Sequence, residues 1–185
     1  MSNSVFNSFA ITVDKNSDLT ALNIHIGGAF ATYVPIQLIG SSAYIDVCTF
    51  SNSSDDYNIE LSNSSIITLD GAIISTSTTQ FALVDTMSEL NILAGNLLAI
   101  DSSTSTTAIE MAGRSRLLVN GAGGTISSSA NCIELQNGSQ AYFADVAWTN
   151  SGAGAGFIKV GSLAAQAGPI ADEFDALGVF SVLNI

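Results

Sequence analysis

Charged side chains are scarce in this sequence. They make up 11% of its 185 residues, where about 25% is usual in a soluble domain, and only four are basic against 16 acids. The resulting net charge of −12 would repel phosphate, so we expect no binding to nucleic acid or to an anionic membrane. The four bases are Lys15, Arg114, Arg116 and Lys159.

Signals for export, membrane insertion and disulfide formation are also missing. No apolar run approaches the roughly 20 residues that span a bilayer. Residues 1–13 lack the basic start and the apolar stretch of a secretory signal. The two cysteines, Cys48 and Cys132, make no disulfide framework, so we expect free thiols. These absences predict a soluble protein that is made and assembled in a cytoplasm.

Residues that usually carry catalysis or hold metals are rare. His25 is the only histidine, and its place between Ile24 and Ile26 is typical of the outward face of a strand. Phosphate-binding loops and calcium-binding glycine repeats are absent. We therefore expect no catalytic residue, no cofactor and no metal.

The sequence is rich instead in one phrase, in which two aliphatic residues flank a residue that is usually polar. NIELSNSS (58–65), AIEMAGRS (108–115) and CIELQNGS (132–139) show it most clearly, and seven copies follow one another at intervals of 23 to 27 residues. The first aliphatic positions are Ile11, Ile36, Ile59, Ala82, Ile109, Ile133 and Ile158. The second are Val13, Leu38, Leu61, Val84, Met111, Leu135 and Val160.

Each phrase predicts a short strand with its aliphatic residues inside the protein. The residues between the aliphatics then point outward: Thr12, Gln37, Glu60, Leu83, Glu110, Glu134 and Lys159. Four residues beyond the second aliphatic stands a serine in six copies, at Ser17, Ser42, Ser65, Ser88, Ser115 and Ser139. We expect these serines to stack and to close the turns by bonds to nearby backbone.

Three short strands in each repeat and a period near 24 residues predict an all-β parallel β-helix of about six to seven coils. The repeat covers residues 10–162. Residues 1–9 are expected to form an N-terminal cap or arm, and residues 163–185 a C-terminal cap or oligomerisation tail outside the repeat.

The repeat pattern resembles the single-stranded, right-handed β-helices of the pectin-lyase-like superfamily. Within it, the chain is most similar to short β-helix modules of bacteriophage spikes, fibres and capsid decoration proteins. The resemblance implies a virion protein that associates with copies of itself, as a homotrimer, and with other virion proteins. It rests on the repeat and not on a signature motif, so it indicates the fold more strongly than the function.

Relatives with this fold also include polysaccharide lyases and hydrolases. Arg114 and Arg116 are the only clustered bases, and we expect them to be solvated turn residues. A hydrolase needs two carboxylates some 5–9.5 Å apart, and Glu110 and Glu134 share the outward position of consecutive coils. We interpret this pair as part of a polar strand face, and the chain as a protein without enzymatic activity.

The residue before each first aliphatic is expected to point outward and so to give one face an apolar stripe, which would mark an interface. The alternative is that these residues turn inward at a bend. The tail is apolar as well and should dock, either on a neighbouring subunit, which we favour, or over its own last coil. The predicted interface residues are Phe81, Cys132, Phe157, Phe174, Leu177, Val179, Phe180, Val182 and Leu183.

These patterns lead us to expect a non-enzymatic structural component of a virus particle that is assembled in the host cytoplasm. It would decorate a capsid or form part of a fibre or spike. The main alternative is a module that binds host surface glycans through outward aromatic residues. Those residues are Tyr44, Tyr57, Tyr142 and Trp148. A third reading, binding to ice, lacks the regular outward row of threonines that it requires.

Overall fold

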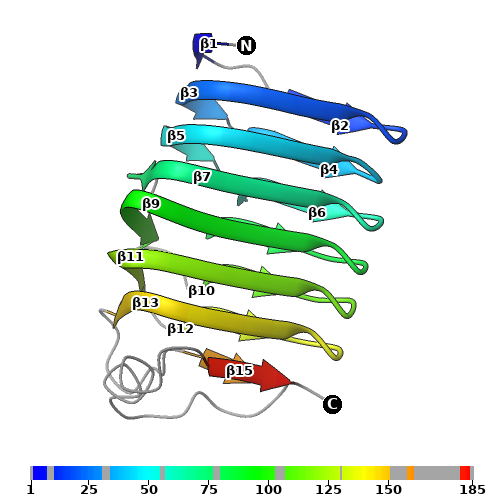
Figure 1. Ribbon diagram of the computed structural model, residues 1–185, viewed down its shortest axis with the longest axis vertical. Helices are drawn as coiled ribbons and strands as arrows, with labels where there is room; N and C mark the ends of the chain where they lie inside the picture. Colours follow the sequence, from blue (N-terminus) through cyan, green and yellow to red (C-terminus); the bar gives the residue numbers. More distant parts are fainter. Residues whose placement is uncertain are drawn as a thin grey trace.

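The computed structural model of the chain is a right-handed β-solenoid in which parallel strands stack along one axis (Figure 1). It describes residues 2–7, 11–30, 34–54, 57–76, 80–102, 107–129, 131–150, 158–160 and 180–183. The prediction of an all-β parallel β-helix is confirmed, although the solenoid makes about five turns where we expected six to seven.

Two sheets make up the described part of the solenoid. The eight-stranded sheet, here sheet A, contains β1 (Ser2–Asn7), β3 (Asp18–Phe30), β5 (Ser42–Ser54), β7 (Ile66–Ser75), β9 (Glu89–Ser102), β11 (Arg116–Ser128), β13 (Gln140–Asn150) and β15 (Phe180–Leu183). The seven-stranded sheet, here sheet B, contains β2 (Ile11–Asp14), β4 (Ile36–Ile39), β6 (Tyr57–Ser62), β8 (Gln80–Val84), β10 (Thr107–Met111), β12 (Asn131–Leu135) and β14 (Ile158–Val160).

Sheet B has the register that the repeated phrase predicts. Its first aliphatic positions pair from Ile11 in β2 to Ile158 in β14 without a break. The outward residues pair in the same order, from Thr12 to Lys159. Stacked aliphatics lie about 4.8 Å apart, so each coil covers the apolar side chains of the previous one. The core therefore runs along the rod as a continuous column of buried side chains.

The second and third strands predicted for each repeat are in fact one long strand. Five of the long strands in sheet A have 11 to 14 residues, and one has 10. Each of these six strands continues through a bend. The bend uses a residue with positive φ, as at Asn23, Val47, Gly71 and Asp145. Hydrogen bonding resumes immediately beyond it, with a register shift beside Val47. A single left-handed residue redirects a strand without a loop, so a turn dipeptide such as Asp70–Gly71 marks a bend here and not the end of a strand.

The expected apolar stripe on the outside is wrong, because the five described residues that precede a first aliphatic position turn inward. Pro35 and Asn58 are buried, and Phe81, Ala108 and Cys132 are each 0% exposed. The Phe81 ring packs edge-on against Phe50, with 5.7 Å between the ring centroids. Alternation fails here because the chain rounds a corner, where two consecutive side chains both face the core. Phe81 and Cys132 are therefore core residues and present no surface to a partner.

The tight turns between β2 and β3 and between the equivalent later pairs stack along one edge of the rod (Figure 1). Most contain two consecutive residues with positive φ: Lys15–Asn16, Asn63–Ser64, Thr86–Met87, Gly113–Arg114 and Asn137–Gly138. The turn between β4 and β5 has one such residue, Gly40, and is one residue shorter than the next turn.

A ladder of serines lines the inner side of these turns. The backbone N–H of each serine donates to the hydroxyl of the serine in the next coil, at 3.1–3.3 Å. The hydroxyls of Ser65 and Ser139 in turn donate to the carbonyls of Ser62 and Gln136. The ladder consists of Ser17, Ser41, Ser65, Ser88, Ser115 and Ser139. We predicted Ser42 for the ladder, and this prediction is wrong: Ser41 takes the place because the second turn is one residue shorter.

The two ends of sheet A are covered by strands from outside the repeat. β1 pairs in parallel with β3, and β15 pairs antiparallel with β13 of the same chain. Phe180, Val182 and Leu183 thus lie over their own last coil, the alternative to the neighbouring subunit that we favoured. Phe157, Phe174, Leu177 and Val179 lie outside the described residues.

Both cysteines are free and buried, as expected for thiols without a disulfide. Cys48 occupies an inward row of sheet A between Ile24 and Ile73. Burial raises the pKa of its thiol to about 12. The Cys132 thiol donates to the carbonyl of Ile126 at 3.5 Å. Neither sulfur is accessible to a partner.

Candidate functional site

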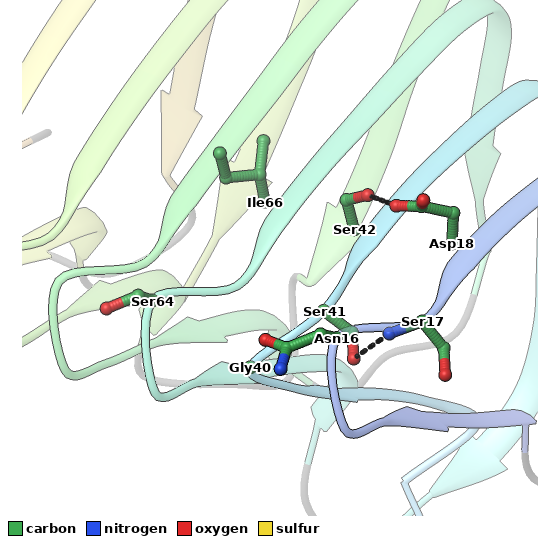
Figure 2. A pocket seen from close by; sticks show the side chains of 8 residues that line it. All are labelled: Asn16, Ser17, Asp18, Gly40, Ser41, Ser42, Ser64 and Ile66. Atoms are coloured by element: carbon green, nitrogen blue, oxygen red, sulfur yellow. Dashed lines mark hydrogen bonds between the residues drawn. The ribbon is translucent and has the colours of Figure 1, made fainter.

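A shallow hollow of about 220 Å³ lies at the short second turn (Figure 2). The turn at Gly40 has one residue fewer than the next, so the surface sinks between the fuller turns of the first and third coils. The hollow is lined by Asn16, Ser17, Asp18, Gly40, Ser41, Ser42, Ser64 and Ile66.

Several polar groups of the hollow already bond to one another. The Ser42 hydroxyl donates to the Asp18 carboxylate, and the Ser41 hydroxyl accepts from the Ser17 N–H (Figure 2). Ser41 also donates to the Ile39 carbonyl at 3.2 Å. Ile66 contributes an aliphatic side chain that is 45% exposed. The hollow therefore combines satisfied hydroxyls with an apolar edge.

The hollow opens onto a surface that we call the outer face. This surface consists of the outward-pointing residues in the part of each long strand that precedes its bend. Its three rows follow the register of sheet A and begin at Asp18, Thr20 and Leu22. Four of the six large hydrophobic side chains exposed in the described residues lie on it: Leu22, Tyr44, Ile66 and Leu118, at 38–45% exposure. No other described face gathers exposed apolar groups in this way.

Tyr44 lies on the middle row of the outer face, on β5, and is 40% exposed. Its hydroxyl donates to the Asp70 carboxylate at 2.9 Å. Asp46 and Asp70 are direct neighbours on β5 and β7. The pKa of Tyr44 is raised, first by the hydrogen bond to Asp70 and then by partial burial and the negative charges of Asp70 and Asp46. Ionisation of Tyr44 would place a third negative charge beside these two carboxylates.

The other aromatic residues predicted for glycan contact lie apart from Tyr44. Tyr142 shares its row but is half-buried, with the Arg116 guanidinium 5.7 Å from its ring centroid. Tyr57 is on sheet B, and its hydroxyl donates to Glu110 at 3.3 Å. The side chain of Trp148 lies outside the described residues. Tyr44 and Tyr142 share a row but lie four strands apart, on β5 and β13, so the described aromatics predicted for glycan contact form no cluster.

Glu110 and Glu134 are register neighbours on the outside of sheet B, as predicted. One amide nitrogen, Nε2 of Gln136, donates to Glu134 at 2.9 Å and to Glu110 at 3.3 Å. Gln37 donates to Glu60 at 3.0 Å on the same face. The two glutamates are therefore held within a network of amide and hydroxyl donors along this sheet.

The remaining candidates have local partners or lie at turns. Arg116 forms a 3.1 Å ion pair with Glu89 of the preceding coil. Arg114 is exposed at the fifth tight turn, in the left-handed conformation. His25 lies on the outward side of β3, and its Nε2 is 3.3 Å from the Ser51 hydroxyl. In the part of the chain that the structure describes, no group of three metal-ligating residues comes together.

Sequence reasoning missed Leu22, Ile66, Leu118 and the hollow. Leu22 and Leu118 follow an inward residue by one position, so alternation along LTALNI and RLLVNG could have placed them outward. The hollow had a weaker signal, which was the single glycine in IGSS where each of the other turns has at least one polar residue. In the described residues, no helix is long and apolar enough to cross a membrane.

Comparison of the chain with protein-family models, with curated proteins and with solved structures finds no match.

Proposed function

We propose that the protein is a non-enzymatic structural component of a virus particle, a rigid rod that associates with copies of itself. The observation that carries this proposal is the outer face, where Leu22, Tyr44, Ile66 and Leu118 are exposed on one side of sheet A. Exposed apolar groups gathered on one face mark interaction surfaces. Such a face can lie against the same face of a neighbouring copy.

The interior supports a structural role as well. A continuous aliphatic core and a serine ladder give the rod the same packing at every level, which favours rigidity over movement. Only 11% of the residues carry charge, so an interface between copies needs to bury few charged side chains. The virus particle and the homotrimer come from the resemblance to phage β-helix modules.

The test is the oligomeric state of the full chain by native mass spectrometry and sedimentation at micromolar concentration. We expect an oligomer, and we expect Leu22→Ser with Leu118→Ser to shift it at least tenfold toward monomer. Leu97→Ser is the matched control, since Leu97 is 46% exposed but lies beyond the bend of β9. A wild-type monomer, or equal losses in control and test variants, would contradict the proposal.

A second candidate function is adsorption to glycans. It is favoured by the exposed Tyr44 ring, which has carboxylates and hydroxyls around it and the hollow next to it. Aromatic rings with nearby hydrogen-bonding groups suit the apolar face and the hydroxyls of a sugar. A glycan array probed with the wild type and with Tyr44→Ala tests this function: binding that Tyr44→Ala abolishes would support it, and an array without signal would reject it.

A further inference from the structure

The tight turns form an edge with a charge balance unlike the rest of the rod. We call residues 14–18, 39–42, 62–66, 85–89, 112–116 and 136–140 the turn edge. It holds three of the four bases of the chain, Lys15, Arg114 and Arg116. Against them stand four acids, Asp14, Asp18, Asp85 and Glu89, so its net charge is −1 out of −12. The turn edge is therefore where a second copy of this acidic protein meets the least repulsion.

The turn edge also carries one projection and one depression. Met87, at the tip of the fourth turn, is 61% exposed, the highest value among the large hydrophobics exposed in the described residues. The hollow is centred on the second turn, at Gly40. The third turn, Asn63–Ser64, lies midway between them. Two coils, or about 10 Å, therefore separate Met87 from the hollow.

Because Met87 and the hollow lie at equal distances from the third turn, a two-fold axis through that turn would make the turn edge complementary to itself. If two copies face each other at their turn edges with a two-fold axis through the third turn, the second turn of each lies opposite the fourth turn of the other. Met87 of each copy then points into the hollow of its mate. The first turn, with Asp14, Lys15 and Asp18, has a net charge of −1 and faces the fifth turn, where Arg114 and Arg116 give a net charge of +2. Such an isologous contact satisfies both copies at once.

The chemistry of the hollow suits a methionine. Its hydroxyls at Ser41 and Ser42 are already bonded within the chain, and its one carboxylate, Asp18, accepts from the Ser42 hydroxyl, so covering these groups costs less than covering unbonded ones. Ile66 provides an apolar contact, and the flexible thioether of methionine fills irregular spaces. Two acids flank Met87: Glu89 is paired with Arg116 of its own chain, and the Asp85 carboxylate accepts from the Thr86 N–H. A parallel pair would instead place Met87 against Met87 and bases against bases.

We infer that the turn edge is a second self-association surface, on which two antiparallel copies insert Met87 into each other's hollow. The contact shares Ile66 and the row that begins at Asp18 with the outer face, but it does not use Leu22 or Leu118. It would join neighbouring rods side by side in opposite directions. Its length of five coils, about 20 Å, places it among small interfaces, so the association is weak and falls with salt.

Cysteine cross-linking tests the antiparallel arrangement. Lys15→Cys and Arg114→Cys change exposed residues of the first and fifth turns, and Cys48 and Cys132 are buried and silent. We expect a mixture of the two variants to form disulfide dimers under mild oxidation at least tenfold faster than either variant alone. Faster dimers from each variant alone would show a parallel contact, and equally slow reactions throughout would show no contact; either result overturns the inference.

Two further variants test the fit of Met87 in the hollow. Met87→Asp should slow the mixed cross-linking at least tenfold, whereas Leu97→Asp, equally charged and on another surface, should not. Insertion of one asparagine between Gly40 and Ser41 restores the longer turn and fills the hollow, and it should slow cross-linking without changing the circular dichroism spectrum. Unchanged rates in both variants overturn the inference. The pair Leu22→Ser with Leu118→Ser should leave these rates unchanged, which separates this contact from the outer face.

Discussion

The chain changes direction in two ways within each coil, and they differ in how regular they are. At the tight turns the same residue type recurs, and each serine bonds to the serine of the next coil. At the bends inside the long strands, Asn23, Val47, Gly71 and Asp145 do the same geometric work with no residue type in common. The tight turn needs a side chain that bonds between coils, whereas the bend needs only a tolerated left-handed φ. A residue type therefore recurs where its side chain bonds between coils, and not wherever the backbone has the same conformation.

The largest effect is expected where two tight turns come closest together. A Cβ added at Gly113 would lie 2.5 Å from the Thr86 nitrogen and 2.9 Å from its Cα, with φ at +61°. Because backbone atoms cannot yield as a side chain does, Gly113→Ala should lower the free energy of unfolding by about 2–4 kcal/mol. Denaturant unfolding measures it. Gly123→Ala is the control, since nothing lies within 4 Å of its added Cβ although its φ is also positive. Equal losses would show that φ alone decides.

Removing one hydroxyl tests whether the serine ladder holds the tight turns together. Ser65 is fully buried, accepts from the Ser41 N–H and donates to the Ser62 carbonyl. Ser65→Ala leaves both backbone groups without this partner, which should cost about 1–3 kcal/mol of unfolding free energy. Ser64→Ala, at the exposed neighbouring position, should cost less than about 0.5 kcal/mol. A Ser65→Ala protein as stable as the Ser64→Ala protein would contradict the role of the ladder.

Alkaline pH tests the interior beside the bend at Val47. The Cys48 thiol has its pKa raised to about 12 by burial, so the folded state keeps its proton where the unfolded state loses it. The contribution of the thiol is fully present below the unfolded pKa of 9.0 and is lost as pH rises toward 12. The unfolding free energy should fall by up to about 1.4 kcal/mol per pH unit in this window. Cys48→Ala should remove that slope in denaturant titrations, and an unchanged slope would assign it to other groups.

The smallest effect is expected at the bend itself, and it should be stabilising. Val47 has φ at +58°, a conformation that β-branched residues rarely adopt. Asn23 occupies the equivalent bend with φ at +52°, and asparagine tolerates this region better. Val47→Asn should raise the unfolding free energy by up to about 1 kcal/mol, offset in part by the lost aliphatic contact. Thermal unfolding measures the change, and a loss above about 1 kcal/mol would mean that the valine side chain matters more than its strain.

Sequence reasoning predicted the short strands because their side chains alternate between core and solvent. All seven copies of the phrase pair as expected, down to Glu110 beside Glu134. It misplaced the serine of the second coil, because a fixed count of four residues cannot detect a turn that is one residue short. The hollow depends on that shortening, and its only signal in the sequence was the single glycine of the second turn, Gly40.

The orientation of Phe81 was misread where alternation stops at a corner. One signal of its burial was nevertheless present. Phe81 precedes Ala82, the only first aliphatic position among the seven that is not isoleucine, and both side chains are fully buried. A large residue beside a small one is how a core of constant volume accommodates both. Volume compensation between neighbours therefore indicates that both face inward, even where alternation suggests otherwise.

The serine ladder has a direction, and this has a consequence for synthesis. In every step of the ladder, the serine N–H of one coil donates to a serine hydroxyl that lies about 24 residues further along the chain. The serine amide of a newly synthesised coil therefore lacks its hydrogen-bond acceptor until the next coil has left the ribosome. We expect the solenoid to fold coil by coil from its N-terminal end. Each added coil completes the one before it and presents the same unfinished end to the next. β15 pairs antiparallel with β13, so it ends the series of parallel strands in sheet A.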